Sequence, residues 1–504
     1  MWSFVSRHLS ILFLVASLGA IANSQTQPAI DRSAIFKTIV THRGAPIAGI
    51  KAARPVSEGA VAPATIFSGP PYTVGPTFTP TSTVPEAEEH IAVDPSNSNN
   101  LVAMISDFSI LRAGFFFNTS KFSVSTNNGS SWSESFVPLN ASKFPVTSEG
   151  HVWQANSDPV VAIDKLGNVY LANLYIQVNS VGNATNDGFY VCSAPMSSGP
   201  TFTAASCRPV RTSLSATSVF EDKEWIATDN STAATSGNVY AIWTHFTASS
   251  DMIFFSRSTD HGVTWSTPIQ INPASQNGAV QGSQVAVGPA GQVYVSYEVF
   301  FAGNKGQHFI AKSTDGGASF GAPVAQTPMF NNLSFGATYR DNSFPALAVS
   351  PVVGKGFVYD VYTDQPGASS RTAFVRSKIA GGLVFTTPKR VNNITTGQRL
   401  MPAVAADTNG VVHISWFDTR NSGGSTNLLD IFATFTKNNG ASFAPNARVT
   451  STPINAGNAG FIGDYAGIAA GPNGSTNFAH PVWTNGGVGG TTSGEMQTAA
   501  IIAP

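Results

Sequence analysis

The sequence is poor in charged residues. Asp, Glu, Lys and Arg make up 11% of its 504 residues, against roughly a quarter in a typical soluble domain. The net charge at pH 7 is -1, so the chain offers no basic surface for a phosphate backbone, and we expect no nucleic-acid partner. Hydrophobic residues make up 42% of the chain, which is enough for a large core. Uncharged Ser, Thr, Asn and Gly must therefore cover much of the surface.

Long hydrophobic runs are also scarce. The apolar run Leu9–Leu18 follows Arg7 and precedes Ala20-Ile21-Ala22, and it is too short to span a bilayer. This pattern predicts a secretory signal peptide over residues 1–22, cleaved near Ala22, and hence a secreted, extracellular protein. The alternative is an uncleaved anchor. No later stretch predicts a transmembrane segment.

Four short stretches share the template Ser/Thr-x-Asp/Asn-x-Gly-x-Ser/Thr-aromatic. The copies are Ser125–Trp132, Ser258–Trp265, Ser313–Phe320 and Thr436–Phe443. An Asp or Asn at the third position can accept hydrogen bonds from backbone N–H groups of its own turn, and the glycine supplies a positive φ. Each copy predicts a hairpin corner, and four copies predict a repeat fold. The third-position residues, which we expect to be structural, are Asn127, Asp260, Asp315 and Asn438.

This template resembles the Asp box, or bacterial neuraminidase repeat, of sialidase-like β-propellers. The resemblance covers roughly residues 75–502. It implies an all-β domain, residues 75–504, built as a propeller of four-stranded blades. Residues 23–74 lack periodicity and are rich in Ala, Pro and Gly, which predicts a partly disordered linker or pro-segment.

A second repeat gives the number of blades. It consists of two strand-like runs joined by a polar turn, and it occurs seven times at spacings close to sixty residues. Perfect or degraded boxes follow six copies, and the seventh is followed only by Met496–Ile502. The segment Gly75–Pro80 resembles Gly199–Ala204, which follows a degraded box. We therefore expect the N-terminal strand to complete the last blade, giving seven blades. The alternative is six, as in sialidases of the family.

The chain has two cysteines, Cys192 and Cys207, which flank one degraded box. They would then lie on paired strands of one hairpin. Because disulfides form readily in exported proteins, we expect a bridge between them. Two buried free thiols are the alternative.

Charged and aromatic residues gather in the loops predicted on the face opposite the boxes. Aromatic rings stack on sugars, arginines hold acidic groups, and paired carboxylates can cleave glycosides. We therefore expect a carbohydrate or glycoprotein partner. These loops would hold 13 of the 28 acids: Glu86, Glu88, Glu89, Asp107, Glu149, Glu221, Asp222, Glu224, Glu298, Asp341, Asp364, Asp418 and Asp464.

The resemblance to sialidases implies an arginine triad, a Tyr/Glu nucleophile pair and an acid/base Asp. Repeat position suggests Tyr465 as nucleophile with Glu224 as its base, and Asp464 and Asp418 as further catalytic residues. The substrate-binding candidates are Arg340, Arg399, Arg420 and Trp416. The early Phe/Tyr-Arg-Ile-Pro motif of the family is absent from this sequence.

Two functional hypotheses follow. The first is a secreted glycoside hydrolase of the exo-α-sialidase type, acting as a monomer. The second is a non-catalytic propeller that binds glycan or protein at the cell surface. No motif predicts a cofactor; calcium could bind loop carboxylates, but none has the spacing of a dedicated calcium loop.

Overall fold

The computed structural model describes residues 65–81, 86–107, 111–112, 115–116, 119–139, 153, 155–178, 184–196, 199–213, 219–337, 339–353, 356–456, 462–473, 476–486 and 494–504. The predicted signal peptide, residues 1–22, and residues 23–64 of the predicted linker lie outside the described residues.

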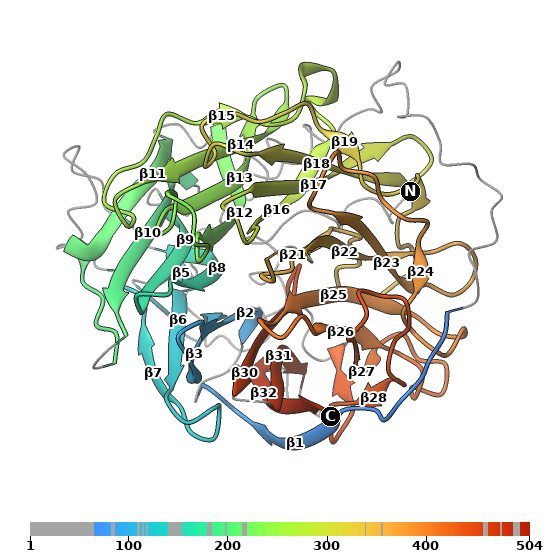
Figure 1. Cartoon of the computed structure of the whole chain (residues 1–504). Helices are drawn as coiled ribbons and strands as arrows, with labels where there is room; N and C mark the ends of the chain where they lie inside the picture. The colour runs from blue at the N-terminus through green and yellow to red at the C-terminus, as the bar shows by residue number, and fades with distance from the viewer. Residues whose placement is uncertain are drawn as a thin grey trace, which may run out of the picture.

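Seven four-stranded antiparallel sheets are arranged in a ring around a central axis (Figure 1). The seven-bladed propeller predicted from the repeats is therefore confirmed. Blade 1 consists of β2 (Glu86–Asp94), β3 (Asn97–Asp107), β6 (Thr119–Ser125) and β7 (Ser133–Phe136). Blade 2 consists of β8 (Ala155–Ile163), β9 (Asn168–Val178), β10 (Ala184–Pro195) and β11 (Cys207–Ser213). Blade 3 consists of β12 (Val219–Thr228), β13 (Val239–Thr247), β14 (Asp251–Ser258) and β15 (Ile269–Gln270).

The remaining blades follow the same plan. Blades 4 to 7 are β16 (Val280–Val287), β17 (Val293–Phe301), β18 (Lys305–Ser313) and β19 (Val324–Ala325); β21 (Ala346–Val349), β22 (Phe357–Asp364), β23 (Arg371–Lys378) and β24 (Lys389–Arg390); β25 (Arg399–Ala406), β26 (Val412–Asp418), β27 (Leu428–Thr436) and β28 (Ala447–Arg448); and β30 (Gly467–Asn473), β31 (Thr476–Gly486), β32 (Gly494–Ala503) and β1 (Thr73–Phe78). The short additions are β4 (Leu111–Arg112), β5 (Phe115–Phe116), β20 (Phe330–Asn331), β29 (Ile454–Asn455) and two 3-10 turns, η1 (Ala204–Ser206) and η2 (Ala274–Gln276).

The first strand closes the ring. β1 pairs antiparallel with β32, with Thr73 opposite Ile502 and Phe78 opposite Thr498. The predicted closure of the last blade by the N-terminal strand is therefore confirmed. The chain also contacts blade 6 before β1 begins, because the Tyr72 hydroxyl lies 2.7 Å from Nδ1 of His413 and the Ser68 N–H donates to the Phe443 carbonyl.

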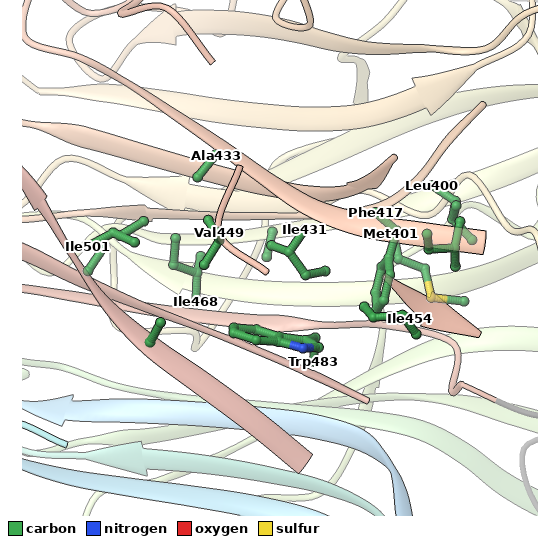
Figure 2. Close-up of a cluster of buried hydrophobic side chains, with 14 of the residues drawn as sticks. Leu400, Met401, Phe417, Ile431, Ala433, Val449, Ile454, Ile468, Trp483 and Ile501 are labelled. Atoms are coloured by element: carbon green, nitrogen blue, oxygen red, sulfur yellow. The ribbon is translucent and has the colours of Figure 1, made fainter. Parts of the chain in front are cut away.

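The core lies between the blades. A sheet inside a propeller has a neighbour on each face, so its middle strands are buried on both sides and do not alternate. In β13 every residue from Val239 to Phe246 is buried. Between blades 6 and 7, Phe417, Ile431, Trp483 and Ile501 fill one such interface (Figure 2).

The box turns have the structural role predicted for them. Asp260 accepts hydrogen bonds from the Thr264 N–H (2.8 Å) and the Thr264 hydroxyl (2.6 Å). Asn127, Asp315 and Asn438 accept the equivalent N–H in their own turns, from Ser131, Ser319 and Ser442. Hydrogen bonds from the Ser319 hydroxyl and from other groups of the turn hold the pKa of Asp315 far below its usual value. This carboxylate therefore has a structural role in its turn.

The two cysteines are bonded to each other. Cys192 in β10 lies opposite Cys207 in β11, and the disulfide joins them. The predicted bridge is confirmed, and it connects the third and fourth strands of blade 2.

A buried glutamate joins the first and last blades near the closure. Glu86, in β2, accepts hydrogen bonds from the Thr81 hydroxyl (2.5 Å) and from the N–H of Met496 in β32 (3.1 Å). Nζ of Lys121 lies 3.8 Å away and makes a closer ion pair, 2.7 Å, with Asp107. Burial raises the pKa of Glu86 to about 7 despite these contacts.

This pKa predicts a pH-dependent closure. The folded state binds the Glu86 proton more tightly than the unfolded state, so its contribution to stability is present at acid pH and is lost as the pH rises from about 4.5 to about 7. The shift corresponds to roughly 3 kcal/mol. Relative to Glu86→Gln, the natural protein should lose up to about that amount over this interval, measured by denaturant unfolding at a series of pH values. Glu134→Gln, near the same lysine but 29% exposed, is the matched control; parallel curves for wild type and Glu86→Gln would contradict the prediction.

Candidate functional site

The inner strands of the propeller, which are the first strands of the blades, carry a repeated bulge. In β2, β8, β12, β16 and β25 the register with the second strand shifts by one residue near the beginning of the strand. One residue of each bulge has a positive φ: Glu88 (67°), Asp158 (50°), Lys223 (56°), Gly282 (70°) and Met401 (46°). Four of these five are not glycine, and each such conformation costs on the order of 1 kcal/mol or more. Bulges re-aim side chains and are common beside active sites.

Three of these bulges bring charged side chains together at one end of the axis. Glu88, Asp158 and Lys223 interact electrostatically with one another and with Asp464, from the loop before β30. Each of these side chains is at most 4% exposed. We call the full group the axial cluster: Glu88, Asp158, Asp222, Lys223, Glu224, Arg340, Asp464 and Tyr465.

Asp158 holds the middle position among the carboxyl groups. Its carboxyl interacts electrostatically with those of Glu88 and Asp222, and burial raises its own pKa. Burial and then the charge of Asp158 raise the pKa values of Glu88 and Asp222 well above the usual range. Burial therefore favours the protonated form of all three carboxyl groups.

Neighbouring side chains orient this arrangement. The Gln281 side-chain amide donates to Asp222 at 2.9 Å. Nζ of Lys223 lies 3.5 Å from the centre of the Tyr465 ring and 5.5 Å from that of Trp225. The Tyr465 hydroxyl donates to the Pro159 carbonyl at 3.1 Å, which fixes the ring under the ammonium.

The residues predicted as catalytic are divided between two places. Asp464, Tyr465 and Glu224 lie in the axial cluster, together with Arg340, which is ion-paired with Asp464. Burial and then the charge of Glu88 raise the pKa of Tyr465 well above its usual value. A nucleophilic tyrosine needs the opposite shift, so the phenol favours a positioning role over the predicted attack.

The other predicted residues form a separate network in blade 6. Asp418 accepts hydrogen bonds from Arg399 Nε (3.1 Å), Arg420 Nη2 (2.6 Å) and Trp416 Nε1 (2.9 Å). The guanidinium of Arg420 also stacks on Phe432 at 3.9 Å. The three predicted arginines are thus paired with two different carboxylates, Asp464 and Asp418.

Similar networks occupy the same end of other blades. In blade 3, Glu221 accepts from Trp243 (2.6 Å) and contacts His245 (2.9 Å). In blade 5, Asp364 accepts hydrogen bonds from Nε (2.7 Å) and Nη2 (2.8 Å) of Arg371. These pairs satisfy buried charges and stabilise strand ends.

The expected placement of the acids in loops is corrected by the structure. Glu149 lies outside the described residues, and each of the other twelve acids is at most 7% exposed. Only Asp341 and Asp464 of these twelve lie outside strands. The neighbouring blades enclose both ends of the inner strands, so residues that resemble solvated loop positions in the sequence become buried.

Asp158 and Lys223 were not among the site residues predicted from the sequence. A signal was present, because Glu88-Glu89, Asp158-Pro159, Lys223-Glu224 and Met401-Pro402 occupy one position of the repeat. Aligning the beginnings of the inner strands would have brought them together. Within the described residues, no group of three or more His, Cys, Asp or Glu side chains is arranged to hold a metal ion.

A funnel of about 680 Å³ lies at the end of the axis marked by the turns between first and second strands. Those turns come from all seven blades. The acids that line it are hydrogen-bonded within their own turns: Asp94 accepts from the Ser96 N–H, and Asp407 accepts from the Asn409 N–H. The funnel therefore lacks the reactive grouping found in the axial cluster.

No protein-family model and no curated protein matches this chain. Solved structures do. An ulvan lyase from a new family of polysaccharide lyases has a TM-score of 0.47 and 10% identity, over 84% of this chain and 95% of that one. The α-L-arabinanase of Penicillium chrysogenum, complexed with arabinobiose, has a TM-score of 0.43 and 13% sequence identity, over 86% of this chain and 98% of that one. The intramolecular trans-sialidase of Ruminococcus gnavus, in complex with oseltamivir carboxylate, has a TM-score of 0.39 and 12% sequence identity, over 67% of this chain and 90% of that one. The likeness to sialidase-type propellers concerns the fold alone.

No helix in the described part of the chain is long and apolar enough to cross a membrane.

The two kinds of buried acid should respond differently to neutralisation. Burial raises the pKa of Asp158, so Asp158→Asn removes a charge that folding disfavours, and it keeps a residue type that tolerates a positive φ; it should raise stability by about 1–2 kcal/mol. Asp418→Asn leaves two arginines without their carboxylate and should cost about 3–5 kcal/mol. Denaturant unfolding of both variants measures the contrast. Equal destabilisation by the two changes would show that Asp158 is as structural as Asp418.

Proposed function

We propose that the protein cleaves glycosidic bonds at the axial cluster. One observation carries the proposal: Asp158, Glu88 and Asp222 form a buried group of interacting carboxyls, and burial raises the pKa of Asp158 and lifts those of Glu88 and Asp222 well above the usual range. Hydrolysis of a glycoside needs a protonated acid for the leaving oxygen and an ionised carboxylate as base or nucleophile. Environments that separate the protonation states of neighbouring carboxyls supply both at one pH.

The roles follow from the protonation states. Asp158 is proposed as the base or nucleophile, and Asp222 or Glu88 as the acid that protonates the departing oxygen. Asp464, which is ion-paired with Arg340, adds negative charge, which stabilises the positive charge that develops on the sugar ring in the transition state. Tyr465 and Arg340 hold Lys223 and Asp464 in place.

The charge balance favours a neutral sugar over a sialic acid. The axial cluster has five carboxyl groups, Glu88, Asp158, Asp222, Glu224 and Asp464, against two cations, Lys223 and Arg340. An exo-α-sialidase would need several arginines around one substrate carboxylate, whereas here Arg399 and Arg420 are paired with Asp418. We propose a neutral glycan or glycoprotein as substrate and, on the predicted signal peptide and the disulfide, action outside the cell.

The alternative is a propeller that binds glycan or protein without turnover. The low exposure of the axial cluster favours it, since Glu88, Asp158 and Glu224 are at most 1% exposed. A binder would retain affinity for its ligand and hydrolyse none of the compounds offered.

A panel of fluorogenic glycosides and plant, algal and bacterial polysaccharides tests the proposal. The natural protein should hydrolyse a neutral glycoside, and Asp158→Asn and Asp222→Asn should each lower kcat/KM by about 100-fold or more. Asp260→Asn is the matched control, because two other boxes carry Asn at that position. Hydrolysis of sialosides alone would contradict the substrate assignment. Full activity in both axial variants would contradict the site.

A further inference from the structure

Gln281 occupies the position in blade 4 that Asp222 occupies in blade 3. Each comes directly before the bulge residue with a positive φ, which is Gly282 in β16 and Lys223 in β12. Gln281 is 2% exposed and Asp222 is 6% exposed. Because the two inner strands are neighbours in the ring, these polar side chains meet between the blades, and Nε2 of Gln281 lies 2.9 Å from Oδ2 of Asp222.

Two donors determine the orientation of the Gln281 amide. Its Oε1 accepts hydrogen bonds from the Gly282 N–H (3.1 Å) and from the Thr244 hydroxyl. Because a backbone N–H can only donate, the amide oxygen must face it, and Nε2 is the atom that donates to Asp222. Thr244 lies directly opposite Asp222 in β13, so the glutamine connects the carboxyl to both blades.

The backbone beside Gln281 has little freedom to move. Gly282 has a φ of 70°, a conformation that residues with a Cβ atom rarely adopt. A Cβ atom at this glycine would lie 2.2 Å from Cδ1 of Phe344, so the bulge is packed against the segment before β21. The glutamine is therefore attached to a rigid support, as a group that orients a catalytic residue must be.

The amide contacts one oxygen of Asp222 and leaves the other for a proton. With an N–H group at Oδ2, the proton of a protonated Asp222 is favoured on Oδ1. Asp222 is also the more exposed of the two acids proposed for the departing oxygen, since Glu88 is 0% exposed. The charged groups that act on Asp222 or respond to it are Asp158, Asp464, Arg340, Asp187, Lys223 and Glu224.

We propose that Gln281 is a positioning residue whose side-chain amide, anchored by Thr244 and Gly282, holds the Asp222 carboxyl in the orientation that protonates the departing oxygen. This inference rests on the proposed function, and it selects Asp222 over Glu88 as the acid. The proton passes from Asp222 to that oxygen as the glycosidic C–O bond breaks and leaves its electron pair there. A carboxyl that rotates away from the departing oxygen lowers the rate without weakening substrate binding.

The test compares two leaving groups on one sugar, the sugar that the natural protein hydrolyses in the fluorogenic panel. A dinitrophenyl group departs with little protonation, whereas a methyl group needs the acid. Gln281→Met keeps the length of the side chain and removes the amide. In this variant kcat for the methyl glycoside should fall by about tenfold or more, with KM within about twofold and with little effect on the dinitrophenyl glycoside.

A second readout needs no substrate. An N–H donor favours the ionised form of a carboxyl, so in Gln281→Met the Asp222 carboxyl should titrate at higher pH than in the natural protein, by about half a unit or more. Carbon-13 NMR of labelled aspartate carboxyls measures this shift, with Asp222→Asn for assignment.

Two further variants control the result. Gln281→Glu keeps the shape of the side chain and donates only when the new carboxyl is protonated, so its activity relative to the natural protein should rise as the pH falls. It also replaces Gln281→Met if that variant does not fold. Gln307→Met is the matched control: Gln307, also in blade 4 and 2% exposed, donates from Nε2 to the Thr327 carbonyl at 2.8 Å, so its change should leave both readouts unaltered.

The outcomes separate the two proposals. An unchanged titration of Asp222 in folded Gln281→Met would overturn the role of Gln281, whatever the activity. Equal losses with the two leaving groups would also overturn it and would assign Gln281 a structural role only. A shifted titration of Asp222, in a protein that hydrolyses no glycoside, would support the hold of Gln281 on Asp222 and overturn the proposed function.

Discussion

Closure of the ring is the constraint on which the rest of the structure depends. A ring of sheets has a weak seam unless one blade combines the two ends of the chain. Here β1 pairs with β32 in blade 7, and Glu86 links blade 1 to Met496 across the same seam. Closure fixes seven inner strands around one axis. The beginnings of those strands meet there, and charges that they carry are buried together.

Buried acids in this protein are of two kinds. Asp418, Glu221 and Asp364 accept several hydrogen bonds each from arginine, tryptophan or histidine neighbours, and these networks hold strand ends together. In the axial cluster, carboxyls face one another across strained bulges at Glu88 and Asp158. Such an arrangement costs stability, because burial and like charges both oppose ionisation. Carboxyls with perturbed pKa values cluster at functional sites.

The fold could be predicted from the sequence because its signals are local. The box template at Ser258–Trp265 specifies a turn with its own hydrogen bonds, and its copies identify hairpins. The likeness of Gly75–Pro80 to Gly199–Ala204 predicted the closure, and the spacing of Cys192 and Cys207 predicted a bridge across one hairpin. None of these inferences required knowledge of which blades are neighbours.

The site could be predicted only in part, because it depends on contacts between blades. Asp464, Tyr465, Glu224 and Arg340 were placed in one group and do meet at the axis. Arg399, Arg420, Trp416 and Asp418 were added to that group, but they satisfy one another within blade 6. Asp158 was missed because a bulge, which leaves no clear mark in a single strand, turns it toward Glu88 and Asp222.

The central claim is that Asp158 remains ionised between two protonated carboxyls, and infrared spectroscopy tests it most directly. At neutral pH the spectrum of the natural protein should contain absorption from protonated carboxyl groups, and Asp158→Asn should shift or remove it because the charge of Asp158 raises the pKa values of Glu88 and Asp222. A neutral-pH spectrum with carboxylate bands alone, unchanged by Asp158→Asn, would contradict the account.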